Sequence, residues 1–141
     1  MTVLYTSIVR PVLEYGCPVW APWHQKDINL LESVQSKALK LCRQNVQLES
    51  LQHRRDMLDL CETYKIMHGF YRTPADSFFS RPYRNIGGHQ YKIFKRRSRL
   101  DIRKNYFSNR VVDAWNRLPI AVVTAPSLTA FKTKLRSLPP V

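Results

Sequence analysis

The chain has 141 residues, 44% of them hydrophobic, and a formal net charge of +13. That length provides one modest hydrophobic core, in one domain or in a helical half with an appended module. No apolar run approaches the ~20 residues that a membrane-spanning helix needs, and no signal-peptide pattern opens the chain. We therefore expect a soluble intracellular protein, nuclear or cytoplasmic and not secreted.

The positive charge is concentrated in the second part of the chain. Residues 1–80 hold 9 basic and 8 acidic side chains, whereas residues 81–141 hold 14 basic and 2 acidic ones. An asymmetry of this size indicates a polyanionic partner rather than general solubility.

The sequence gives little support for catalysis or for a bound metal. Cys17, Cys42 and Cys61 lie far apart, which argues against a disulfide framework, and no C-x2-C or H-x3-H pair indicates a structural zinc site. Nucleophile motifs and glycine-rich phosphate loops are also missing from the sequence. We predict no catalytic residues, no metal and no cofactor.

Residues 1–69 are predicted to form a helical region that begins with an apolar helix. Pro11 lies inside this helix, so we expect a kink there or a new start near Arg10, with Gly16 ending the helix. Residues 17–23 contain two prolines and two tryptophans and are predicted to form a rigid apolar connector that covers a core.

Two amphipathic helices are predicted next. Asp27 is expected to cap a helix that continues to about Cys42, and Ser50 to cap a third helix that ends at Gly69. Apolar residues recur in both at three- and four-residue steps, which is typical of a helix with one buried face.

Residues 70–104 are predicted to form a loop-rich basic linker, and residues 105–141 a C-terminal helical pair. In the linker, Gly87 and Gly88 indicate a turn, and residues 91–94 give a weak strand signal. In the C-terminal helical pair, a fourth helix is expected to begin at Asn105 or Tyr106 and to stop at Pro119. A connector over Ala121–Ala125 follows. The last helix is expected to be capped by Ser127 and to carry an apolar stripe from Leu128 to Leu138. The predicted fold is mainly α, a cluster of about five helices with a loop-rich basic segment between the third and the fourth.

The candidate site is the basic segment, Lys92–Lys104, which places seven cations within thirteen residues. Cations that neutralise phosphates release counterions and so supply affinity without a sequence code, and aromatic rings add stacking on unpaired bases. We predict that the following residues bind nucleic acid: Lys92, Lys95, Arg96, Arg97, Arg99, Arg103, Lys104, Tyr106 and Arg110.

Simpler interpretations of these residues stay open. The cations could form a solvated basic face, or a nuclear-localisation tract around Lys95–Arg99. Among the aromatic residues, Phe107 matches the phase of a buried helical stripe, which leaves Tyr91 and Tyr106 as the better stacking candidates. Asp113 is expected to cap its helix or to pair with a cation on the same helix.

Two motifs resemble the C-terminal part of LINE-type, jockey-like non-LTR retrotransposon reverse transcriptases. The first is LYTSIVRPVLEYG at residues 4–16, and the second is RLDIRKNYFSNRVV at residues 99–112 followed by WNRLP at residues 115–119. The second resembles a family pattern in which Tyr106 stands in the place of a phenylalanine. The ending, from Ala125 to Leu135, also fits, so the resemblance covers nearly the whole chain.

The resemblance implies the thumb and post-thumb region of such an enzyme, with residues 1–69 as the thumb-like part. In those enzymes this region would hold RNA or DNA, as template and primer, beside the polymerase palm. The Tyr-x-Asp-Asp metal-binding motif of the palm is missing from the sequence. We therefore expect a fragment, a remnant or truncated reading frame, without polymerase activity of its own.

The resulting hypothesis is a nucleic-acid-binding accessory fragment that holds template and primer by phosphate contacts. Two alternatives remain. One is a protein-interaction or self-association module that uses Trp20, Trp23 and the Leu128–Leu138 stripe, with a palm or another protein as its partner. The other is a nonfunctional retroelement remnant. A hidden nuclease is the remotest alternative.

Overall fold

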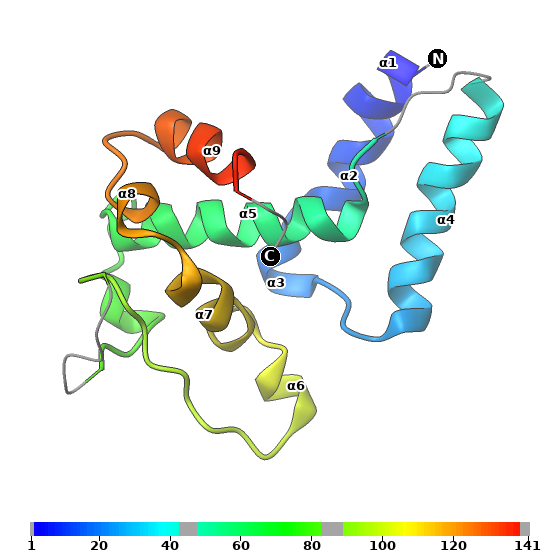
Figure 1. Cartoon of the computed structure of the whole chain (residues 1–141). Helices are drawn as coiled ribbons and strands as arrows, with labels where there is room; N and C mark the ends of the chain where they lie inside the picture. Colours follow the sequence, from blue (N-terminus) through cyan, green and yellow to red (C-terminus); the bar gives the residue numbers. More distant parts are fainter. Residues whose placement is uncertain (1, 43–47, 83–88, 139–141) are drawn as a thin grey trace. The chain divides into compact units, whose positions relative to one another are not determined.

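The computed structural model describes residues 2–42, 48–82 and 89–138 and is mainly helical, as predicted (Figure 1). Within these ranges the backbone pairs as strands do only at one isolated antiparallel bridge, between Ser80 and Phe94. The chain divides into two compact units, residues 1–56 and residues 57–141. None of the helices in the described ranges combines the length and the apolarity needed to cross a membrane.

The first unit opens with three consecutive helical pieces, α1 (Thr2–Leu4), η1 (Tyr5–Val9) and α2 (Arg10–Glu14). The η1 piece is a π-helical turn in which the Arg10 N–H donates to the Tyr5 carbonyl. This wide turn directly precedes Pro11, whose ring crowds the preceding turn of an ordinary α-helix. The predicted new start at Arg10 is therefore confirmed. Gly16 ends the helix with φ of 65°, a conformation that favours glycine.

The predicted connector over residues 17–23 is partly wrong, because Cys17–Trp20 forms a short helix, α3. Pro18 lies in its first turn, where a missing N–H costs nothing. Trp20 and Trp23 are both partly exposed, so they do not simply cover a core as expected. The Arg55 guanidinium lies 5.8 Å from the centroid of the Trp20 ring.

The next helix, α4 (Gln25–Cys42), begins before Asp27, so the predicted N-cap is wrong. Asp27 lies in the first turn instead, where its negative charge still complements the helix dipole. Polar contacts join α4 to the rest of its unit. The Tyr5 hydroxyl donates to Gln35 Oε1 at 3.0 Å, and Gln35 Nε2 donates to the Glu49 carbonyl at 3.0 Å.

The third long helix, α5 (Leu51–Met67), has both predicted ends. The Ser50 hydroxyl accepts a hydrogen bond from the His53 N–H, and Gly69 follows the helix with φ of 71°. The helix contributes its first residues to the first unit and its remainder, from Met57 onward, to the second.

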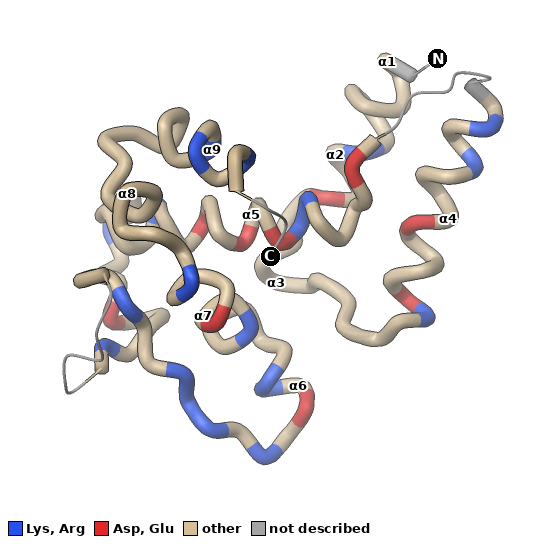
Figure 2. Tube along the Cα trace, in the orientation of Figure 1, with Lys and Arg blue, Asp and Glu red and all other residues tan. Residues whose placement is uncertain are grey.

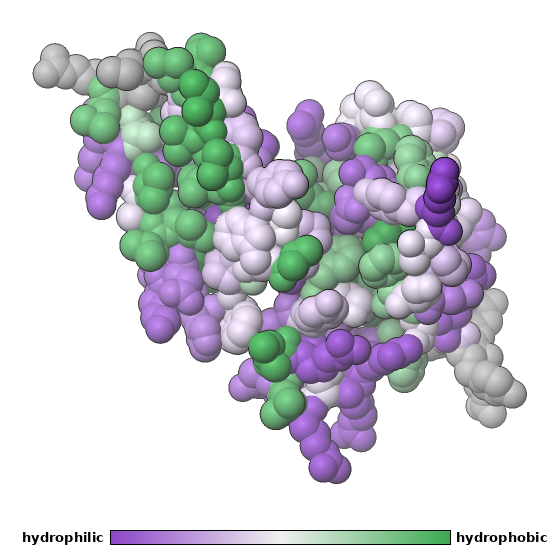
Figure 3. Space-filling model, turned by 180° about the vertical axis from the view of Figure 1, so that it is seen from behind, coloured by the Kyte–Doolittle hydropathy of each residue, from purple (hydrophilic) through white to green (hydrophobic). Residues whose placement is uncertain are grey.

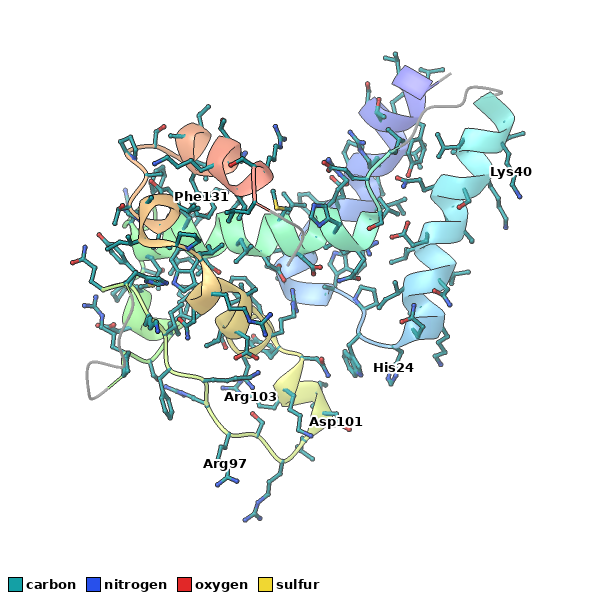
Figure 4. All side chains as sticks on the ribbon, viewed as in Figure 1. His24, Lys40, Arg97, Asp101, Arg103 and Phe131 are labelled. Atoms are coloured by element: carbon teal, nitrogen blue, oxygen red, sulfur yellow. The ribbon has the colours of Figure 1, made fainter. Side chains whose placement is uncertain are left out.

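The second unit packs the later part of α5 against three helices, α7 (Phe107–Arg117), α8 (Ile120–Val123) and α9 (Leu128–Arg136). The short helix α6 (Asp101–Lys104) precedes α7, and its residues are exposed. The sequence did not predict α6, and α8 replaces the expected connector. Ser127 caps α9 as predicted, accepting from the Ala130 N–H at 3.2 Å. Phe131 extends from α9 into the core, where it stacks on Tyr64 with ring centroids 4.5 Å apart (Figure 4).

Residues 70–104, expected to be a linker, belong to this second unit. A short 3-10 turn, η2 (Ala75–Ser77), leads to Phe79, which is buried in the core together with Ile93. Among the residues that the structure describes, strand-like pairing near the predicted strand 91–94 is limited to the bridge at Phe94. Gly87 and Gly88, the predicted turn, lie outside the described residues.

Candidate nucleic-acid interface

One side of α7 is polar and contacts the basic segment. Asn109, Asp113 and Asn116 are spaced four and three residues apart, which places them on the same side of a helix. The core side of α7 carries the buried Val112 and Trp115. The helix thus separates a packed interior from a row of hydrogen-bonding groups.

The beginning of the basic segment is fixed by Asn116 and Trp115. Asn116 Nδ2 donates to the Ile93 carbonyl at 2.8 Å, and Asn116 Oδ1 accepts from the Ile93 N–H at 3.0 Å. Trp115 Nε1 donates to the Tyr91 carbonyl at 2.8 Å. The Ile93 side chain is buried in the core, so both the backbone and the side chain of this residue are held in place.

Ser80 supports the segment at the next residues. The Phe94 N–H donates to the Ser80 carbonyl at 2.7 Å, and the Arg96 guanidinium donates from Nε and Nη2 to the Ser80 hydroxyl at 2.9 and 2.7 Å. These bonds fix the Arg96 side chain. Because the Ser80 hydroxyl is neutral, this contact does not neutralise the positive charge of Arg96.

Asp113 forms an ion pair with Lys95 from the middle of the segment. The expectation that Asp113 pairs within its own helix is therefore not met; the loop brings a closer cation to it. Both side chains are about half exposed, at 48% for Lys95 and 51% for Asp113. Exposed pairs of this kind contribute about 0–1 kcal/mol to stability, so Lys95 remains able to exchange its partner.

Asn109 contacts the far part of the segment. Its Nδ2 donates to the Ser98 hydroxyl at 3.3 Å and, at the limit of hydrogen-bond distance, to the Arg103 carbonyl at 3.5 Å. Because Asn116, Asp113 and Asn109 contact Ile93, Lys95 and Ser98 in turn, the segment runs antiparallel to α7. Figure 2 shows the resulting loop with Lys and Arg along it up to α6.

The arginines of the basic segment are exposed. In the described part of the chain no acidic side chain pairs with Arg97 or Arg99, and Figure 4 shows Arg97 pointing away from α7. The Arg103 guanidinium lies 5.3 Å from the centroid of the exposed Tyr106 ring, a cation–π arrangement. The structure thus gathers Arg97, Arg99 and Arg103 on one exposed loop and its following turn.

Three other predicted site residues have different surroundings. Lys104 pairs with Asp101 one turn back on α6, at 2.7 Å. Lys92 is partly buried. Arg110 donates from Nε and Nη2 to the carboxylate of Asp59 at 2.8 and 3.1 Å, and from Nη1 to the Asn105 carbonyl at 3.0 Å. With Asp59 only 6% and Arg110 21% exposed, this pair fixes α7 to α5.

The three aromatic residues near the basic segment differ in their exposure. Phe107 is buried against Phe79, with ring centroids 5.8 Å apart, so its expected core role is confirmed. Tyr106 immediately precedes α7 and is exposed. Tyr91 is partly buried beside His68, at 5.0 Å between ring centroids. Of the two predicted stacking residues, Tyr106 is the accessible one.

Sequence reasoning missed the residues that position the segment: Ser80, Asn109 and Asn116. The polar spacing on α7 was a usable signal for a helix face, but nothing in the sequence indicated which loop that face contacts. Over the described ranges, no three His, Cys, Asp or Glu side chains gather as a metal site would require.

Comparisons with known proteins identify no relative of this chain. No protein-family model, no curated protein and no solved structure matches the chain.

Proposed function

We propose that the chain binds nucleic acid through the exposed cations of the basic segment, with Arg96, Arg97, Arg99 and Arg103 contacting phosphates. One observation carries this function: α7 holds the segment in a defined path while Arg97 and Arg99 remain exposed and unpaired within the described residues. Guanidinium groups suit phosphate because their planar fork donates two parallel hydrogen bonds.

Self-repulsion supports a polyanionic ligand over a merely solvated face. Residues 57–141 contain 16 basic and 5 acidic side chains, and each of the five acids already pairs with a cation of the same unit: Asp59, Glu62, Asp76, Asp101 and Asp113. Crowded like charges destabilise a compact fold unless a partner neutralises them. Lys92, Lys95 and Lys104 would then add to the surrounding positive field, and the exposed Tyr106 would offer a face to an unpaired base.

We further propose that this binding belongs to an accessory fragment of a retroelement reverse transcriptase, which would hold RNA or DNA template and primer in the nucleus or cytoplasm and carry out no catalysis itself. The support is positional. The motif at residues 99–112 supplies α6, Asn109 of the polar side of α7, and Arg103 with Tyr106, and the WNRLP stretch at residues 115–119 supplies Asn116. Residues of the motif therefore coincide with the candidate interface and not only with the core.

A salt titration of binding tests the nucleic-acid function. The full chain is titrated into a labelled single strand of about 20 nucleotides, as RNA and as DNA, and anisotropy is followed at several salt concentrations. Wild type should lose affinity steeply with salt. The double variant Arg97→Ala/Arg99→Ala should bind more weakly, and the slope of log affinity against log salt should be shallower by about 1.4.

A matched variant separates site from net charge. Lys132→Ala/Arg136→Ala removes the same charge from exposed positions on α9. It should retain the wild-type slope. A wild-type slope near zero, or equal losses in the two double variants, would contradict the proposed interface.

A further inference from the structure

The first helical stretch of the chain has its charges inside and its apolar side chains outside. Residues 2–22 contain only two charged side chains, Arg10 and Glu14, and these are just 19% and 11% exposed. The Glu14 carboxylate binds the Arg54 guanidinium through Nε and, at 3.0 Å, through Nη2, and Arg10 lies beside it at 3.9 Å. Both charges are therefore satisfied within residues 1–56.

Large apolar side chains occupy the solvent side of the same stretch. Ile8 and Val12 stand four residues apart on the helical stretch that ends at Glu14, Tyr15 directly follows it, and Val19 lies on α3. Figure 3 shows hydrophobic side chains gathered in a band over this part of the molecule. The N-terminal apolar face consists of side chains that are 57–85% exposed: Val3, Leu4, Ile8, Val12, Tyr15 and Val19. Exposed apolar side chains gathered in this way are rare on monomeric soluble proteins and mark a site of interaction.

We propose that a second copy of the chain covers the N-terminal apolar face, so that two copies associate symmetrically through their first helices. The six side chains together expose roughly 700 Å², close to the ~800 Å² that each partner contributes to a standard stable interface. A two-fold axis brings the same face of both copies together, so one self-complementary apolar surface is sufficient.

The charges favour a second copy over a lipid surface. Helices that lie on membranes carry exposed Lys and Arg beside their apolar face, whereas Arg10 is turned inward to Glu14 here. Residues 1–56 contain 7 basic and 5 acidic side chains, so two copies can approach through them with little repulsion. The 16 basic and 5 acidic side chains of residues 57–141 would oppose association through that part.

Sedimentation equilibrium of the full chain tests this association. The protein is treated with nuclease and measured in 0.5 M salt. At this ionic strength the electrostatic screening length is about 4 Å, so residual nucleic acid cannot hold two copies together through charge. Wild type should form a dimer. Ile8→Glu/Val12→Glu should raise the dimer dissociation constant at least about tenfold, because it would bury four carboxylates at the axis.

Two controls keep the test decisive. Ile102→Glu/Ile120→Glu introduces the same charge at positions 62% and 58% exposed in the second unit and should leave the dimer intact. Mixing Ile8→Glu/Val12→Glu with Ile8→Lys/Val12→Lys should restore association through opposite charges, which a misfolded variant would not do. The proposal fails if wild type stays monomeric at about 100 µM, a concentration that detects even a weak dimer. It also fails if the mixture stays monomeric, or if a monomer instead binds zwitterionic lipid vesicles through this face.

Because this experiment excludes nucleic acid, its outcome is separate from that of the salt titration. Either proposal can stand if the other fails.

Discussion

The side-chain amide of Asn116 bonds both backbone groups of Ile93, donating to the carbonyl and accepting from the N–H. A single residue of α7 thus takes the place that a neighbouring strand would have in a sheet. Together with Asn109 at Ser98, it orders the basic segment before any ligand is present. Binding then avoids the entropic cost of ordering a flexible loop.

Replacing Asn116 by alanine should destabilise the second unit. The change leaves the N–H and carbonyl of Ile93 without their partner next to a buried side chain, which costs about 2 kcal/mol. Urea unfolding followed by circular dichroism measures the free energy of unfolding. Asn105→Ala is the matched control, because the Asn105 side chain makes a single, exposed hydrogen bond within the described residues, to the Asp101 carbonyl, and its backbone contacts stay in the variant. Equal losses in the two variants would mean that Asn116 does not hold the segment.

Much of the helical framework follows from local sequence signals. Ser50 and Ser127 cap α5 and α9 because each hydroxyl meets an amide that the helix leaves unbonded, and Pro11 determines where α2 begins. Gly16 and Gly69 end their helices in the left-handed region. Such signals act over four residues or fewer, so a sequence shows them directly.

Removing the charge of Asp113 should strengthen nucleic-acid binding with little effect on the fold. Asp113→Asn releases Lys95 and removes a negative charge from beside the basic segment. The pair is about half exposed, so the free energy of unfolding should change by less than about 1 kcal/mol. Anisotropy at low salt should show affinity severalfold higher than wild type. Weaker binding by this variant would indicate that Asp113 holds Lys95 in a position that the ligand needs.

Long-range pairings are what the sequence left undetermined. Asp59 and Arg110 stand 51 residues apart, and Asp113 bonds a cation 18 residues before it in preference to neighbours on its own helix. When basic residues are selected only because many of them lie close together in the sequence, the sequence does not show which acidic side chain each one contacts in the fold. Arg110 and Arg97 therefore look alike in the sequence, although the first bonds a buried carboxylate and the second is exposed.

Arg110→Met should destabilise the protein far more than the loss of an exposed cation does. Removal of its guanidinium leaves the Asp59 carboxylate, which is 6% exposed, without this partner, and a broken buried pair costs about 3 kcal/mol. Lys104→Met removes an exposed cation with a neighbouring acid and should cost less than about 1 kcal/mol. Thermal and urea unfolding of both variants checks the difference. Similar stabilities would show that the Asp59 contact contributes little.

The stability of the second unit should fall when the pH drops below about 6.5 because of His89. Burial lowers the pKa of His89, opposed by the hydrogen bond between its Nε2 and the Trp115 carbonyl and assisted by the nearby charge of Lys92. The unfolded chain, with an ordinary pKa near 6.5, then binds the proton more readily than the folded chain does. Protonation therefore favours unfolding.

The sign of this linkage fixes the pH window. Well above pH 6.5 the imidazole is neutral in both states and contributes no slope, whereas between about 6.5 and the lower folded pKa the free energy of unfolding decreases with falling pH. Urea unfolding at pH 7.5 and pH 5.0 should show a smaller decrease in His89→Gln than in wild type. His24→Gln, which alters an exposed histidine, should keep the wild-type decrease. If His89→Gln keeps it as well, the buried imidazole is not what couples this fold to pH.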